Sequence, residues 1–234
     1  MKRTGAILAL LLLLLLTVSS APADDAGRAA RDEMVRTQIA DRGIRDPATL
    51  AAMRAVPRHR FVPPDLAESA YADEPLPIGY GQTISQPYIV AFMTETLRLK
   101  PGHKVLEVGA GSGYQAAVLA RIVREVFTIE IVPELGNAAR ERLRMLGYRN
   151  VRAHVADGYD GWPEEAPFDA IVVTAAADHI PPPLIRQLRD GGRMVIPVGS
   201  PFFVQTLMLV EKDRGKIRTT SLMPVRFVPF TRRR

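Results

Sequence analysis

The second half of the chain alternates between short apolar runs and longer amphipathic stretches, and this rhythm constrains the fold more than any other feature. Apolar runs at 105–108, 125–131 and 151–156 predict strands, and the stretches at 114–123 and 133–146 between them predict helices. Strands separated by helices pair in parallel, because a crossover connection returns the chain to the same edge. We therefore expect an α/β fold whose doubly wound, mostly parallel sheet is covered by helices on both faces.

Four further runs bring the expected sheet to seven strands. They lie at 170–174, 193–198, 206–210 and 217–227, with a short helix at 183–188. No helix separates the last two runs, so we expect them to form an antiparallel hairpin at one side of the sheet.

The first part of the mature chain is expected to be a helical preface. Helices are predicted at 29–42, 47–54 and 87–97, and a proline-rich stretch between them is expected to be irregular apart from a short helix at 66–71. The length suits one domain, 24–234, in which 24–100 form the helical and substrate-loop part and 101–234 form the cofactor-binding core.

The extreme N-terminus has the pattern of a signal peptide. Lys2 and Arg3 precede an apolar run from Ala6 to Leu16, and Ala21-Pro22-Ala23 fits the small-x-small cleavage pattern. We expect residues 1–23 to be removed, which makes the product periplasmic or secreted, without stable membrane association. An uncleaved anchor, or a start codon placed too far upstream of a cytosolic protein, are the alternatives.

Composition narrows the functional classes. The chain has no cysteine, which excludes disulfides, thiolate metal sites and a cysteine nucleophile. The net charge is +6, but the basic residues are interleaved with acidic ones or lie at the chain ends, and aromatic residues are 6% of the chain. A nucleic-acid-binding module is therefore disfavoured. No pair of histidines has metal-ligand spacing, and we predict no metal site. A monomer is the expected state.

The turn after the first strand of the alternation carries the strongest chemical signal. Gly109, Gly111 and Gly113 occupy every second position between a strand and a helix, which lets backbone N–H groups approach a ligand closely. A nicotinamide-dependent dehydrogenase would instead show G-x-G-x-x-G. Glu107 lies two residues before the first glycine, where a carboxylate suits an ammonium group better than a pyrophosphate.

Two more acids follow the next two strands. Glu130 ends one strand and can hydrogen-bond both ribose hydroxyls, and Asp157, before Gly158, can accept from an adenine amino group. The carboxyl ends of parallel strands meet at one edge, so these acids and Glu107 converge there. A ligand with an amine, a ribose and an adenine but no phosphate is S-adenosylmethionine. The alternative is that Glu107 and Asp157 cap a helix or a turn.

Several segments then resemble a known family. They are Arg58–Pro63, Leu76–Pro87 (which contains Gly81-Gln82-Thr83-Ile84-Ser85-Gln86), Pro167–Ala176 and Val225–Pro229. From about Glu33 to Thr231 the chain resembles the protein-L-isoaspartate O-methyltransferases, although Ala156 stands where the family commonly has glycine. Thr231 falls near the C-terminal stretch that closes over the cofactor in relatives.

This resemblance implies a Rossmann-like methyltransferase that uses S-adenosylmethionine and acts on isoaspartyl-containing proteins and peptides, starting their repair through a succinimide. It implies that Ser85 is the active-site serine and that Gln82, Thr83 and Ile84 line the substrate pocket. Family members are usually cytoplasmic, in contrast to the export signal. The cofactor residues that it implies are Glu107, Gly109, Gly111, Ser112, Gly113, Glu130, Asp157 and Gly158.

Residue chemistry alone leaves two alternatives for this site. Ser85 could be the N-cap of the helix that begins near Pro87, as serine often is. A methyltransferase acting on another carboxylate or on a small molecule would also keep the glycine turn. A carboxylate acceptor with a pKa of about 3–4 is already ionised at neutral pH, so the reaction requires positioning rather than a general base.

Overall fold

The computed structural model describes residues 27–232, so the expected signal peptide, 1–23, lies outside the described residues. A seven-stranded sheet in the order β5-β4-β3-β6-β7-β8-β9 forms its centre. The first five strands in that order are parallel, and β8 and β9 are antiparallel to their neighbours, as the sequence predicted. The strands are β3 (Lys104–Val108), β4 (Glu125–Glu130), β5 (Val151–Val155), β6 (Phe168–Val173), β7 (Leu188–Val198), β8 (Gln205–Asp213) and β9 (Lys216–Val225).

Helices connect the parallel strands. They are α4 (Tyr114–Ala120), α5 (Pro133–Met145) and α6 (Pro182–Gln187). Alternate residues of each strand face opposite sides of the sheet: Val105 and Val126 pack with the N-terminal helices, and Leu106 and Phe127 pack with Leu184 of α6. All five of these residues are completely buried, so both faces of the sheet are covered here. In the described part of the chain, no helix is long and apolar enough to cross a bilayer.

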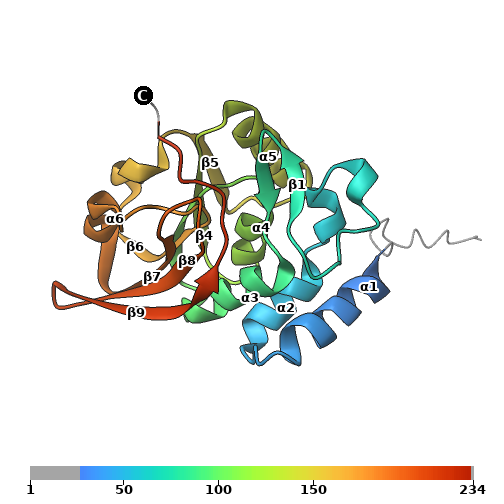
Figure 1. The fold of residues 1–234 in the computed structure, drawn as a ribbon, viewed down its shortest axis with the longest axis horizontal. Helices are drawn as coiled ribbons and strands as arrows, with labels where there is room; N and C mark the ends of the chain where they lie inside the picture. The colour runs from blue at the N-terminus through green and yellow to red at the C-terminus, as the bar shows by residue number, and fades with distance from the viewer. Residues whose placement is uncertain (1–26, 233–234) are drawn as a thin grey trace, which may run out of the picture.

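The preface contains α1 (Arg28–Glu33), α2 (Pro47–Ala55) and α3 (Pro87–Thr96). In Figure 1, α1 lies on the side of the molecule away from β9, whereas α3 lies beside the end of β9. The first helix was predicted as one α-helix, but it continues after α1 as a π-helix, Met34–Ala40, whose Met34, Val35 and Ile39 are buried. The prediction of a helix at 66–71 is wrong. A 3-10 helix, Pro64–Leu66, is followed there by turns.

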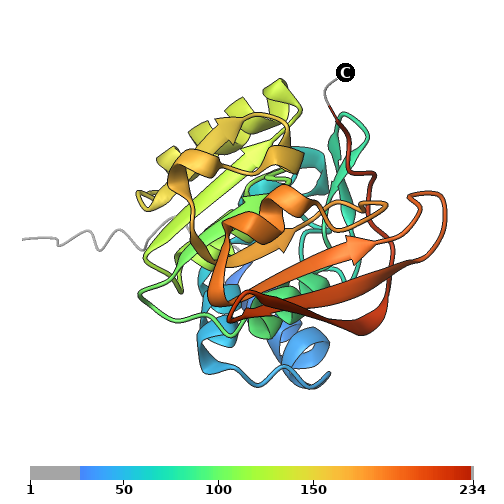
Figure 2. The ribbon, with the colours of Figure 1, turned by 90° about the vertical axis from the view of Figure 1, so that its left-hand side faces the viewer.

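The proline-rich stretch, which was expected to be irregular, contains an antiparallel hairpin of β1 (Leu76–Gly79) and β2 (Gln82–Ile84). Leu76 and Ile84 are register partners and are both buried, so packing against the core holds the hairpin despite Pro77. Figure 2 shows this hairpin on the same side of the molecule as the β7–β8 loop and the C-terminal segment.

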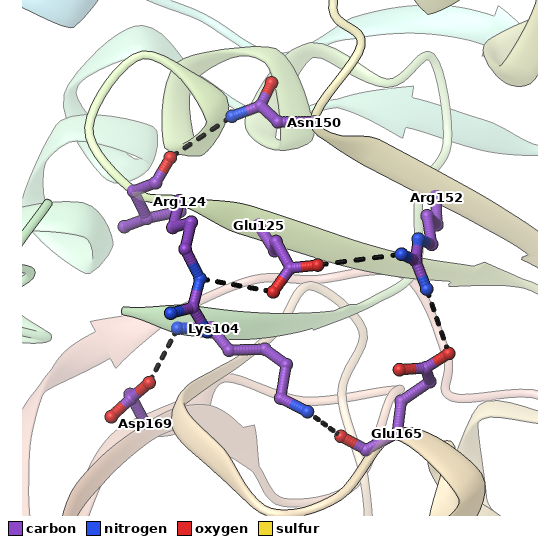
Figure 3. A network of polar contacts seen from close by, with 8 residues as sticks. Lys104, Arg124, Glu125, Asn150, Arg152, Glu165 and Asp169 are labelled. Carbon is purple, nitrogen blue, oxygen red and sulfur yellow. Dashed lines mark hydrogen bonds and ion pairs between the residues drawn. The ribbon is translucent and has the colours of Figure 1, made fainter. Parts of the chain in front are cut away.

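Polar contacts tie together the amino ends of the central strands, on the edge opposite to the hairpin (Figure 3). The Lys104 amide donates to Asp169 Oδ2 at 2.6 Å, and its side-chain amino group donates to the Glu165 carbonyl oxygen. Arg152 forms ion pairs with Glu165, at 3.1 Å, and with Glu125, at 3.7 Å. The five residues lie on or beside β3, β4, β5 and β6, so this network stabilises one edge and leaves the carboxyl edge free for a ligand.

Candidate active site

The glycine turn between β3 and α4 has a backbone that other residues rarely adopt. Gly109, Gly111 and Gly113 have φ values of 99°, 52° and 87°. A Cβ added at Gly109 would lie 2.4 Å from Thr174 Oγ1, at the end of β6, so the turn packs directly against the neighbouring strand. Gly113 is the N-cap of α4. The turn therefore brings backbone N–H groups to the carboxyl edge of the sheet.

Glu107 lies on β3 just before this turn and is completely buried. Thr128 on β4 donates its hydroxyl to Glu107 Oε2, whereas Oε1 has no hydrogen-bond partner among the described residues. Burial raises the pKa of Glu107 to about 8; the Thr128 bond opposes this shift and the neighbouring Glu130 adds to it. Glu107 lines the cavity, and its buried carboxyl oxygen without a partner is suited to a cationic ligand group.

Glu130 ends β4 and is fixed by two backbone donors. Its Oε2 accepts from the Gly111 amide at 2.7 Å, and its Oε1 accepts from the Val132 amide at 3.0 Å. Each carboxylate oxygen keeps a free lone pair for another donor. The side chain is 6% exposed and lines the same cavity as Glu107, so these lone pairs can accept from donors in the cavity.

Asp157 follows β5 and is the N-cap of the 3-10 helix Gly158–Asp160, so the capping alternative is confirmed for this residue. Its Oδ1 accepts from the Tyr159 amide at 3.0 Å, and its Oδ2 pairs with Arg232 Nε at 2.8 Å. The hydrogen bond to Asp157 raises the pKa of Arg232, whose guanidinium lies 3.7 Å above the Tyr159 ring. The sequence analysis gave Arg232 no role. The structure places it beside the cavity, against Asp157, because the segment after β9 returns over the carboxyl edge.

This C-terminal segment is held by backbone hydrogen bonds. The Ala176 amide donates to the Val228 carbonyl oxygen and the Phe230 amide donates to the Ala176 carbonyl oxygen, each at 2.8 Å. A Cβ added at Gly158 would meet Val108 Cγ1 at 2.4 Å and Phe230 Cζ at 3.7 Å. Phe230 and Thr231 therefore form a wall of the cavity beside Gly158.

Ser85 lies between β2 and α3 and lines the cavity from the side of the preface. The N-cap of α3 is Gln86, and Pro87 is the first helical residue, as predicted. Ser85 is therefore not the helix cap, and that alternative is wrong. Its neighbour Thr83 is exposed at the mouth of the same cavity.

One cavity thus brings together most of the residues that the sequence singled out. Gly113 and Asp157 are not among the residues lining it; they support the turn and the Arg232 pair. Tyr114, Gln115 and Thr174 also line it and were missed, because nothing in their sequence context separates them from ordinary core residues. The described residues contain no group of three or more potential metal ligands. The expected residues that line the cavity are Gln82, Thr83, Ile84, Ser85, Glu107, Gly109, Gly111, Ser112, Glu130 and Gly158.

The comparisons with known proteins agree with this geometry. The family model described as protein-L-isoaspartate(D-aspartate) O-methyltransferase matches residues 29–234. The chain belongs to this family. A protein-L-isoaspartate O-methyltransferase of Opitutus terrae is 58% identical, covering 95% of this chain and 96% of the relative. One of Polaromonas sp. is 64% identical, covering 81% of this chain and 90% of the relative.

Solved structures of the same methyltransferase family share the fold. A solved protein-L-isoaspartate O-methyltransferase superposes with a TM-score of 0.77 at 29% identity, covering 86% of this chain and 65% of its own length. A Plasmodium falciparum chain assigned to the family, in complex with S-adenosyl-L-homocysteine, gives a TM-score of 0.75 at 28% identity and covers 86% and 98%. These matches confirm the family resemblance and the fold inferred from the sequence.

Proposed function

We propose that this protein-L-isoaspartate O-methyltransferase family member transfers a methyl group from S-adenosylmethionine to the free α-carboxylate of L-isoaspartyl residues in damaged proteins and peptides. One observation carries the proposal: a single cavity is lined by the glycine turn and Glu107 and Glu130 on one side and by the Ser85 loop on the other. The cofactor side and the acceptor side of a transfer reaction therefore share one space.

The residues present fit the cofactor. The unpartnered Oε1 of Glu107 suits its ammonium group, and Glu130, fixed by two amides, suits its ribose hydroxyls. The space beside Gly158 and Phe230, which a Cβ at Gly158 would narrow, suits its adenine. Bound S-adenosylmethionine supplies an electrophilic methyl group.

On the acceptor side, the Ser85 hydroxyl orients the carboxylate for attack, and Thr83 supports it at the cavity mouth. The carboxylate, with a pKa of about 3–4, is ionised at neutral pH and needs no general base. The chain contributes by holding the two reactants in line and excluding water. The amide nitrogen of the following residue attacks the carbonyl carbon of the resulting methyl ester and expels methanol, which closes a succinimide. Water then opens this ring, in part to a normal aspartyl bond.

The test uses two peptides that differ only in an isoaspartyl or an aspartyl residue, with S-adenosylmethionine labelled on its methyl group. We expect base-labile label on the isoaspartyl peptide alone. We expect Ser85→Ala to lower the rate, by about tenfold or more, with cofactor affinity unchanged. Label on neither peptide, despite cofactor binding, would assign the site to another carboxylate or to a small-molecule acceptor.

We also propose that residues 1–23 direct export, that residues 24–234 are the mature single-domain enzyme, and that it acts as a monomer. The charged start, apolar run and Ala21-Pro22-Ala23 sequence support export. Fractionation with N-terminal sequencing of the purified protein tests cleavage before Asp24, and light scattering tests the monomer. A cytoplasmic product that begins at Met1 would overturn the export proposal.

A further inference from the structure

A second hollow of about 440 Å³ adjoins the cavity and shares Thr83, Ser85, Thr174 and Val228 with it. The second hollow therefore continues from the acceptor side of the site. Its walls come from the Ser85 loop and the start of α3, from Val204 in the β7–β8 loop, and from the end of β9 with the segment that follows it. Figure 2 shows the hairpin, the β7–β8 loop and the C-terminal segment together on this side of the molecule.

The described residues that line the second hollow carry only positive charge. None of the described residues that line it is acidic, whereas Arg42 and Arg226 both line it. Arg42 is already paired: it contacts Asp73 at 2.9 Å, and its guanidinium lies 3.7 Å above the Tyr88 ring. Arg226 is exposed and has no ion-pair partner among the described residues. The free positive charge of the hollow therefore comes from Arg226.

The rest of the wall is largely apolar, with Tyr88, Val204 and Phe227 among its residues. An occupant that reaches Ser85 while covering this wall must extend beyond a single amino acid, which fits a segment of polypeptide on either side of the reacting residue. A positive charge on such a wall, with no carboxylate to offset it, favours acidic side chains in that segment.

We propose that Arg226 is a specificity-determining residue, which makes the enzyme prefer isoaspartyl sites that have an acidic residue close by in the sequence. This inference rests on the proposed function and narrows its substrate class. Arg226 contacts the flanking residue rather than the reacting carboxylate. Its loss should therefore change the ranking of substrates and leave the reaction on a neutral substrate intact.

The test measures kcat/KM on isoaspartyl peptides that are identical except at one position, which carries Glu, Gln or Lys. The varied position is, in turn, each of the two residues before and each of the two residues after the isoaspartate. For at least one position we expect the wild-type protein to prefer Glu over Lys by about tenfold, since an exposed charge pair contributes about threefold in each direction. The preference should shrink at 0.5 M salt, where charges are screened beyond about 4–5 Å.

Arg226→Gln should reduce this preference to about twofold or less while keeping kcat/KM on the Gln peptide, and Arg226→Glu should invert it. Arg218→Gln is the matched control: Arg218 is exposed near the start of β9, whereas Arg226 directly follows the other end of that strand, and the variant changes the net charge equally. It should keep the wild-type preference.

Equal rates on the Glu, Gln and Lys peptides for the wild type, or the same preference in Arg226→Gln, would overturn the inference while leaving the proposed function standing. An equal loss on all peptides would also overturn it, because Arg226 would then support the site as a whole. Absence of label on every isoaspartyl peptide would mean that the proposed function itself has failed.

Discussion

Replacing Glu107 by glutamine tests how a buried carboxyl controls cofactor binding. The side chain is completely buried and its pKa is raised to about 8, so at pH 7 about nine in ten molecules carry the neutral acid. An ammonium group binds the ionised form, and binding must therefore remove the proton. Affinity for the cofactor should rise about tenfold between pH 6 and 7, about fivefold between pH 7 and 8, and level off above pH 8.

The assay is isothermal titration calorimetry with S-adenosylhomocysteine, which carries the same ammonium group and is not turned over. Comparing buffers of different ionisation enthalpy at pH 7 should reveal release of nearly one proton per ligand bound by the wild type. Glu107→Gln should release none, lose the pH dependence below pH 8, and bind about 10–100-fold more weakly at pH 8, because a charged hydrogen-bond partner is removed.

Glu164→Gln is the matched control, since Glu164 is exposed in the 3-10 helix Pro163–Glu165 and does not line the cavity. It should behave as the wild type does. A wild-type affinity that is flat between pH 6 and 8, or a Glu107→Gln protein that keeps the wild-type slope, would refute the argument that the buried carboxyl ionises on binding.

The same pKa shift affects stability without ligand. A carboxyl whose pKa rises on folding stabilises the native state below its unfolded pKa, and this contribution is lost as pH rises toward about 8. The melting temperature of the free wild type should therefore fall between pH 5 and 8 more steeply than that of Glu107→Gln. Gly109→Ala should weaken cofactor binding by tenfold or more and lower the melting temperature, because its Cβ would lie 2.4 Å from Thr174 Oγ1; titration and thermal melts check this. Arg232→Gln should speed cofactor release in stopped-flow measurements by no more than about fivefold, with the effect fading in high salt, since its pair with Asp157 is partly exposed. Arg152→Gln should reduce the free energy of unfolding by about 0–1 kcal/mol and leave kcat unchanged, because the pair with Glu165 lies at the opposite edge.

The sequence predicted the parts of this fold that depend on local pattern. The strand–helix alternation led to the parallel core, and the spacing of Glu107, Glu130 and the glycines led to residues that line one cavity at the carboxyl edge. These features follow from the period of apolar residues and from the conformations open to glycine. They require no knowledge of distant contacts.

The parts that were not predicted depend on contacts between distant segments. The β1–β2 hairpin forms where prolines predict irregular chain, because burial of Leu76 against Ile84 outweighs the local preference. Arg232 lies beside the cavity only because its guanidinium pairs with Asp157, which is 75 residues earlier in the chain. A single sequence does not reveal such a pairing, since an arginine near a chain end is most often solvated.

The pair between Arg232 and Asp157 also bears on how this enzyme itself ages. Asp157 is followed by Gly158, and glycine has no side chain to hinder attack of its own backbone nitrogen on the preceding carboxyl group. That attack closes the ring from which an isoaspartyl bond arises, and it needs a carboxyl group that is free to rotate and lose its charge. Here one oxygen is held by the Tyr159 amide and the other by the guanidinium. The contacts of Asp157 thus oppose, at this Asp-Gly pair, the formation of the lesion that the family repairs.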